Sequence, residues 1–151
     1  MSFILIRHGL STFNQKQAEV KTKYGADSPE YASVKNDLSE IDSELHPIGI
    51  KQCEDHQMNE TKFKVVFVSP LRRALQTAIH MFKTHPDKKE IQFIILPIAR
   101  EVMGWACDIA VSYDQMKEEF GGTHEGIFFD FSMFGQYATQ QMWQVNTYAT
   151  I

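Results

Sequence analysis

Residues 2–14, SFILIRHGLSTFN, decide the fold class that the sequence predicts. Their apolar run FILI includes two β-branched isoleucines, and it predicts a buried strand over residues 2–7. Gly9 allows a sharp turn after this strand, and Ser11 or Thr12 can cap the helix that follows. The segment therefore predicts a strand, a tight turn and a helix in succession.

The same succession recurs further along the chain. KVVFVS (64–69) predicts a second strand, and PLRRALQTAIHMF (70–82) predicts a second helix because its apolar residues recur at helical spacing. IQFIIL (91–96) predicts a third strand. Further helices are predicted over residues 13–23, 46–58 and 112–120. Strands that alternate with helices are typical of an α/β fold, so we predict one three-layer α/β/α domain with a mostly parallel sheet over residues 1–151. Residues 24–44 are expected to form a surface excursion, and the aromatic segment 123–134 shows no clear period.

Composition excludes several classes of protein. The 151 residues are 43% hydrophobic and 23% charged, which is the balance of a globular domain and not of a disordered chain. The net charge of -4 would repel nucleic acid and anionic lipid, so we expect neither as a partner. The two cysteines lack metal-ligand spacing, and no apolar run is long enough for a signal peptide or a membrane span. We therefore expect a cytoplasmic protein without a metal or another cofactor.

A local anion site is predicted at one edge of the sheet. Parallel strands bring their carboxyl ends to the same edge, so Arg7 and His8 are expected near the start of the helix that carries Arg73. Arginines beside a helix amino end are well suited to bind phosphate. Arg72 points about 100 degrees away around the same helix, which makes it the weaker candidate.

Two residues are candidates for chemistry on a bound phosphoryl group. A neutral imidazole at His8 could attack phosphorus and form a phosphohistidine. Glu101 follows the third strand by a short loop and should reach the same edge, where a carboxylic acid could protonate the leaving alkoxide.

Three ordered motifs resemble those of the histidine phosphatase superfamily, also called the phosphoglycerate mutase-like proteins. They are LIRHGLSTFN, VSPLRRALQTA and LPIAREVMGW, and ELHPIGIKQCE is similar to a fourth, with His46 in place of the usual threonine. The resemblance implies His8 as the phosphorylated nucleophile and Glu101 as the proton donor. It also implies Arg7, Arg73 and Asn14 as phosphate-binding residues, a phosphorylated small molecule or phosphoprotein as substrate, and more loosely a eukaryotic phosphatase-like branch of the family.

The sequence departs from the family at one position of the expected site. The family normally has a second catalytic histidine at the end of a later strand, and none of the histidines after His8 follows a hydrophobic strand. Three explanations stay open. The last strand could lie beyond Ile151, which we favour, the chain could bind a phosphorylated ligand without turnover, or another group could replace the histidine. The segment REVMGW also lacks the Glu-Arg-x-Tyr-Gly step usual in mutases, which favours hydrolysis over mutase chemistry.

Overall fold

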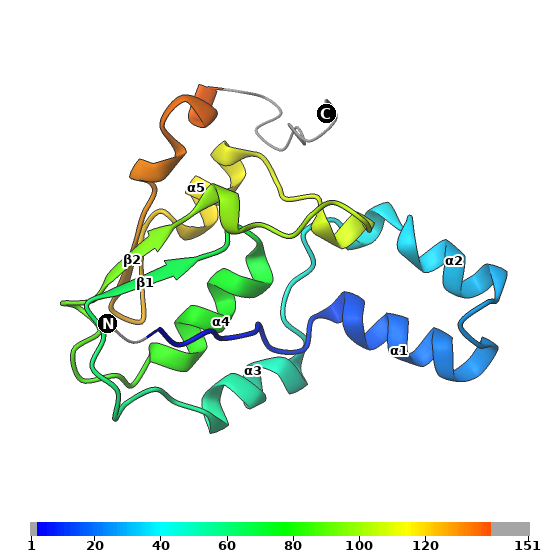
Figure 1. Cartoon of the computed structure of the whole chain (residues 1–151), viewed down its shortest axis with the longest axis horizontal. Coiled ribbons are helices and arrows are strands. Elements are labelled where there is room, and N and C mark those ends of the chain that lie inside the picture. The colour runs from blue at the N-terminus through cyan, green and yellow to red at the C-terminus, as the bar shows by residue number, and fades with distance from the viewer. Residues whose placement is uncertain (1–2, 140–151) are drawn as a thin grey trace.

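The fold is taken from a computed structural model, which describes residues 3–139. In that range, α-helices pack with a four-stranded sheet (Figure 1). The helices are α1 (Thr12–Tyr24), α2 (Pro29–Lys35), α3 (Pro47–Asp55), α4 (Arg72–Phe82) and α5 (Tyr113–Phe120). The strands are β1 (Val65–Val68), β2 (Gln92–Ile95), β3 (Thr123–His124) and β4 (Ile127–Asp130). Short 3-10 segments are η1 (Leu38–Glu40), η2 (Pro97–Ala99), η3 (Ala106–Asp108) and η4 (Ser132–Thr139).

The sheet is mostly parallel. Its strand order is β1-β2-β4-β3, with β1 parallel to β2, β2 parallel to β4, and β3 antiparallel to β4. The register places Val65 opposite Gln92 and Phe93 opposite Phe129. The predicted α/β class with a mostly parallel sheet is therefore confirmed.

The core lies between one face of this sheet and the helices. Phe93 of β2 contacts Phe82 of α4 edge-on, with ring centroids 5.2 Å apart, and Phe129 of β4 contacts Phe120 of α5 at 6.3 Å. On the opposite face, Phe67 and Phe128 are more than half exposed. Of the two helix layers that a three-layer arrangement requires, the described residues thus show one.

The prediction of a buried strand over residues 2–7 is wrong for the residues described. Residues 3–7 pair with no strand in the described part of the chain, and the side chains of Phe3 and Leu5 are almost fully exposed. Figure 1 shows this segment as an extended dark-blue trace that leads into α1. An apolar run gains the strand conformation from its neighbours as much as from its own propensity, and here no described strand lies beside it.

Two regular segments have no counterpart in the sequence-based prediction. The supposed surface excursion contains α2, which begins with a Ser28 cap on the amide of Tyr31 and a proline at the first helical position. The aromatic segment after Gly122 forms the hairpin of β3 and β4. Its turn consists of Glu125 and Gly126, both with positive φ, which is the geometry of a tight two-residue hairpin.

The start of α4 is held by a carboxylate distant in sequence. Asp42 is fully buried, and it accepts hydrogen bonds from the amides of Arg72 at 2.8 Å and Val111 at 3.0 Å. Burial raises the pKa of Asp42, and the two hydrogen bonds oppose that shift. The helix that carries Arg73 therefore begins at a position fixed by the chain segment before α3.

Candidate functional site: the pocket around His8

The turn that follows the N-terminal segment is tied to α3 and α4. The amide of Gly9 donates to Thr77 Oγ1 of α4 at 3.1 Å, and the amide of Leu10 donates to Gln52 Oε1 of α3 at 3.0 Å. The carbonyl of Leu10 in turn accepts from the amide of His46 at 2.8 Å. These bonds hold the turn against α3 and α4, although residues 3–7 before it form no strand.

Two glycines allow the turn to approach α3. A Cβ at Gly9 would lie 2.7 Å from the carbonyl oxygen of Gly49, and a Cβ at Gly49 would lie 2.1 Å from the carbonyl oxygen of Leu10. Both distances are too short for non-bonded atoms. The backbone of the turn and the first turn of α3 can therefore touch only because neither residue carries a side chain.

The ring of His8 has a defined tautomer. Its Nδ1 lies 2.7 Å from the carbonyl oxygen of Gly9, and because a carbonyl only accepts, Nδ1 carries the proton. Nε2 then keeps its lone pair. A pocket of about 280 Å³ opens beside the ring, and its lining includes Arg7, His8, Asn14, Gln17 and Gln52. Two of the predicted phosphate-binding residues therefore line the same pocket as the predicted nucleophile.

The surroundings of His8 favour the neutral imidazole. Burial lowers the pKa of His8, and the positive charges of Arg73 and Arg7 lower it further. The hydrogen bond to Gly9 and the negative charge of Glu101 oppose the shift. The charges of Arg73, Arg7 and Glu101 thus act on the His8 ring. Of the predicted site residues, Arg7 and Asn14 line the pocket with His8, whereas Arg73 and Glu101 are not part of its lining.

We expect the imidazole of His8 to titrate below its ordinary value of 6.5. The cause is the loss of water around the ring together with two nearby cations, both of which disfavour imidazolium. A titration of the side-chain NMR signals of His8 measures this midpoint without any substrate. A midpoint for His8 at or above 6.5 would contradict the described environment.

Arg73 is anchored more tightly than the sequence suggested. Its side chain is 4% exposed. Nη1 donates to the carbonyl oxygen of Cys107 at 2.6 Å, and Nη2 donates to Asp108 Oδ1 at 3.1 Å. The same Nη2 lies 3.7 Å from Glu101 Oε2. The neighbouring Arg72 instead pairs with Glu119 at 2.7 Å, away from this cluster.

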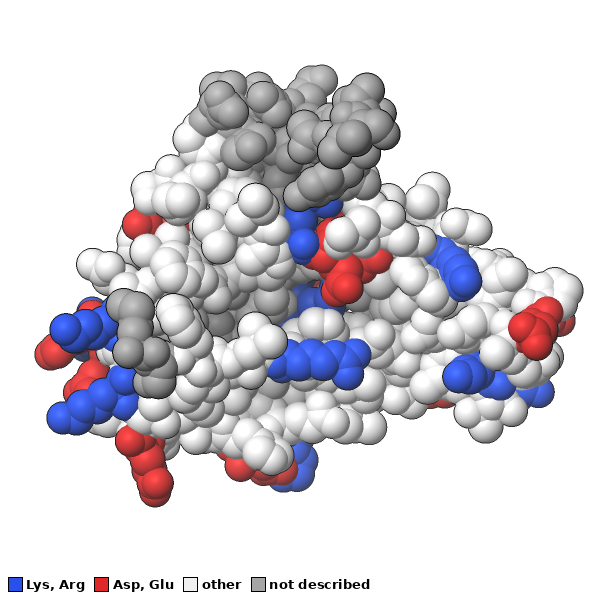
Figure 2. Space-filling model, viewed as in Figure 1, with Lys and Arg blue, Asp and Glu red and all other residues white. Residues whose placement is uncertain are grey.

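Glu101 lies in the loop between η2 and η3. Its side chain is 61% exposed, so the carboxyl group is open to solvent beside Arg73. On the face of the described residues that Figure 2 shows, blue and red side chains lie together around a hollow near the centre, and further blue and red side chains lie at the left edge, along the bottom and at the right.

The remaining histidines make other contacts. His124 of β3 packs against the rings of Phe120 and Phe129, and its Nε2 is buried without a hydrogen-bond partner. His80 lies 3.3 Å from Glu54. His46, His56 and His85 bond to backbone atoms. In the described part of the chain, none of these histidines lines the pocket around His8.

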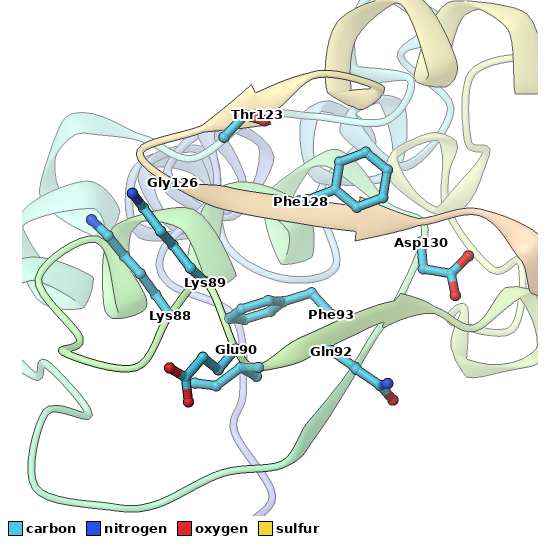
Figure 3. A pocket seen from close by; sticks show the side chains of 10 residues that line it. Lys88, Lys89, Glu90, Gln92, Phe93, Thr123, Gly126, Phe128 and Asp130 are labelled. Atoms are coloured by element: carbon cyan, nitrogen blue, oxygen red, sulfur yellow. The ribbon is translucent and has the colours of Figure 1, made fainter.

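A second, larger hollow lies elsewhere on the sheet. Figure 3 shows this pocket of about 530 Å³ between β2 and β4, with Lys88 and Lys89 at one end and Phe128 and Asp130 along β4. Its lining shares no residue with that of the His8 pocket. Across residues 3–139, no cluster of three or more His, Cys, Asp or Glu side chains is placed to hold a metal ion, and no helix could cross a bilayer.

Comparison with known proteins identifies the family. A profile described as "Histidine phosphatase superfamily (branch 1)" matches residues 32–126, more than half of the chain. The chain belongs to the histidine phosphatase superfamily. The match includes Arg73 and Glu101 and begins after α1, so Arg7, His8 and Asn14 are assigned from their local sequence and geometry alone.

A fungal protein is similar over part of the chain. It is a probable phosphatase of Schizosaccharomyces pombe (strain 972 / ATCC 24843), 28% identical over 87 residues. The similar region covers 55% of this chain and 40% of the relative, so the chain spans about two fifths of that protein's length. The family resemblance in the sequence is thereby confirmed.

Several residues around the candidate site were not singled out from the sequence. Gln52 and Gly49 belong to the fourth motif, so the motif itself was the available signal. Thr77 and Asp108 carry no local signal, because their partners are distant in sequence. Cys107 is buried, and burial together with the nearby Asp108 carboxylate raises the pKa of its thiol to about 12, which leaves it unreactive.

Proposed function

We propose that this chain transfers the phosphoryl group of a phosphomonoester to His8 and then to water. The observation that carries the proposal is the His8 ring, whose Nδ1–H is held by Gly9 while Nε2 stays unprotonated beside two arginine charges. A fixed tautomer and a lowered pKa are what a nucleophilic imidazole needs near neutral pH.

The reaction has two balanced steps. In the first, the lone pair of His8 Nε2 attacks phosphorus, the ester P–O bond breaks, and Glu101 gives its proton to the leaving alkoxide. In the second, a water molecule loses its proton to Glu101 and attacks the phosphohistidine, which releases inorganic phosphate and restores the imidazole. Arg7 and Arg73 offset the negative charge of the phosphoryl oxygens in both steps.

Two other functions make different use of the same site. A mutase would return the phosphoryl group to a sugar acid, and a binding module would hold a phosphorylated ligand without turnover. The segment REVMGW favours hydrolysis over mutase chemistry. Hydrolysis is our conclusion because His8 has the tautomer and the charges that attack on phosphorus requires.

The proposal is tested with p-nitrophenyl phosphate and with a radiolabelled phosphomonoester. We expect release of p-nitrophenol, and a rapid quench should trap label on the protein that is stable in base and lost in acid, as a phosphoramidate bond is. Binding of phosphate without labelled protein would support the binding module and overturn hydrolysis. Transfer of the label to an added sugar acid in preference to water would support a mutase.

A further inference from the structure

We propose that Asp108 is the positioning residue that holds Arg73 and the Glu101 loop in one arrangement, an inference that rests on the function proposed above. Its Oδ1 accepts from Nη2 of Arg73 at 3.1 Å. Its Oδ2 accepts from the backbone amides of Gly104 at 3.2 Å and Trp105 at 3.0 Å. One carboxylate thus joins helix α4 to the end of the loop that carries Glu101.

The ion pair between Asp108 and Arg73 is buried, which strengthens it. The side chains of Asp108 and Arg73 are 6% and 4% exposed, so water competes little with their ion pair. A guanidinium has five N–H groups, and the bonds to Asp108 and to the carbonyl of Cys107 use two of them. Nη2 also lies 3.7 Å from Glu101 Oε2, so these contacts fix the orientation of the guanidinium beside the Glu101 carboxylate.

The loop needs such an anchor because Glu101 is not held by its own burial. Its side chain is 61% exposed, and the ion pair that it forms among the described residues is with Arg73, at 3.7 Å. The far end of the loop is fixed at Trp105, whose ring packs edge-on against Phe13 and Tyr31. Asp108 connects this end of the loop to Arg73. The distance between Glu101 and Arg73 is therefore held constant.

The variant Asp108→Asn tests this role. Asparagine keeps the size of the side chain, but its NH2 group must face either the guanidinium of Arg73 or the backbone amides of Gly104 and Trp105. Because one set of contacts is lost in either case, Arg73 should leave its present position. Losing one hydrogen bond to a charged group should raise the inhibition constant of inorganic phosphate and the KM for p-nitrophenyl phosphate by about tenfold. The NMR midpoint of His8 should also rise, because the charge of Arg73 now lowers it.

The NMR midpoint of His8 distinguishes a positioning role of Asp108 from a simple loss of protein stability. Removing the negative charge of Asp108 would by itself lower the midpoint of His8, so a rise requires that Arg73 has moved. The matched control is Glu119→Gln, which removes the partner of Arg72 one residue earlier on α4. That variant should leave both the phosphate inhibition constant and the His8 midpoint unchanged.

The outcomes distinguish this inference from the proposed function. If the wild-type protein binds phosphate and a folded Asp108→Asn variant binds it equally well or more tightly, Asp108 does not position Arg73. If the wild-type protein neither binds phosphate nor forms labelled protein, the proposed function itself fails. Where Asp108→Asn does not fold, Asp108→Glu decides: the carboxylate shifted by one methylene should weaken phosphate binding, and unchanged binding would overturn the inference.

Discussion

The variant His8→Asn should lose both turnover and the acid-labile phosphoryl label. Asparagine can still donate to the carbonyl of Gly9 from a similar position, so the turn should keep its shape, but no ring nitrogen remains to attack phosphorus. Removing a covalent nucleophile costs roughly three or more orders of magnitude in rate. Hydrolysis of p-nitrophenyl phosphate and the rapid-quench label measure the two effects on the same preparation.

The control for His8→Asn is the same change at an exposed histidine. His56 directly follows α3, and its exposed side chain bonds to the carbonyl of Gln52, so His56→Asn should leave hydrolysis and labelling at wild-type levels. Inorganic phosphate should still bind to His8→Asn, because both arginines are kept. Turnover or a phosphohistidine label that survives in His8→Asn would exclude His8 as the nucleophile.

Sequence patterns predicted the elements whose conformation and burial follow from their own residues. Helix α4 has an apolar stripe that packs on the sheet, and Leu75, Ala78 and Phe82 of that stripe are buried. The N-terminal run has an equally apolar sequence, yet Leu5 is exposed because no described strand lies beside it. A strand depends on a partner elsewhere in the chain, whereas a helix forms its backbone hydrogen bonds within its own segment.

The residues of the candidate site also fall into two groups, those that the sequence predicts and those that it does not. Arg7, His8 and Asn14 share one short sequence motif, and the structure places all three at one pocket. Asp108 could not be found from the sequence, because its role comes from a bond to Arg73 across 35 positions. Residues that supply chemistry recur in short motifs, whereas the residues that orient them are defined only by the folded geometry.

The variant Gly49→Ala should destabilise the protein although it replaces glycine in a helix. In α3 the intrinsic preference for alanine over glycine would stabilise by up to about 1 kcal/mol. The added Cβ would instead lie 2.1 Å from the carbonyl oxygen of Leu10, and a backbone atom cannot move aside as a side chain can. We expect the free energy of unfolding to fall by about 3 kcal/mol, as for other overpacked sites, measured by urea denaturation.

The same change should also reduce catalysis in the fraction that remains folded. Leu10 bonds to Gln52 and His46, so a shift of its backbone moves the turn that carries His8. A displacement of about 1 Å at a reacting group costs on the order of a hundredfold in rate. The control is Gly122→Ala, where an added Cβ has no atom within 4 Å and the stability change should stay within about 0.5 kcal/mol. Equal stability and turnover in the two variants would show that the close contact between the His8 turn and α3 does not shape the site.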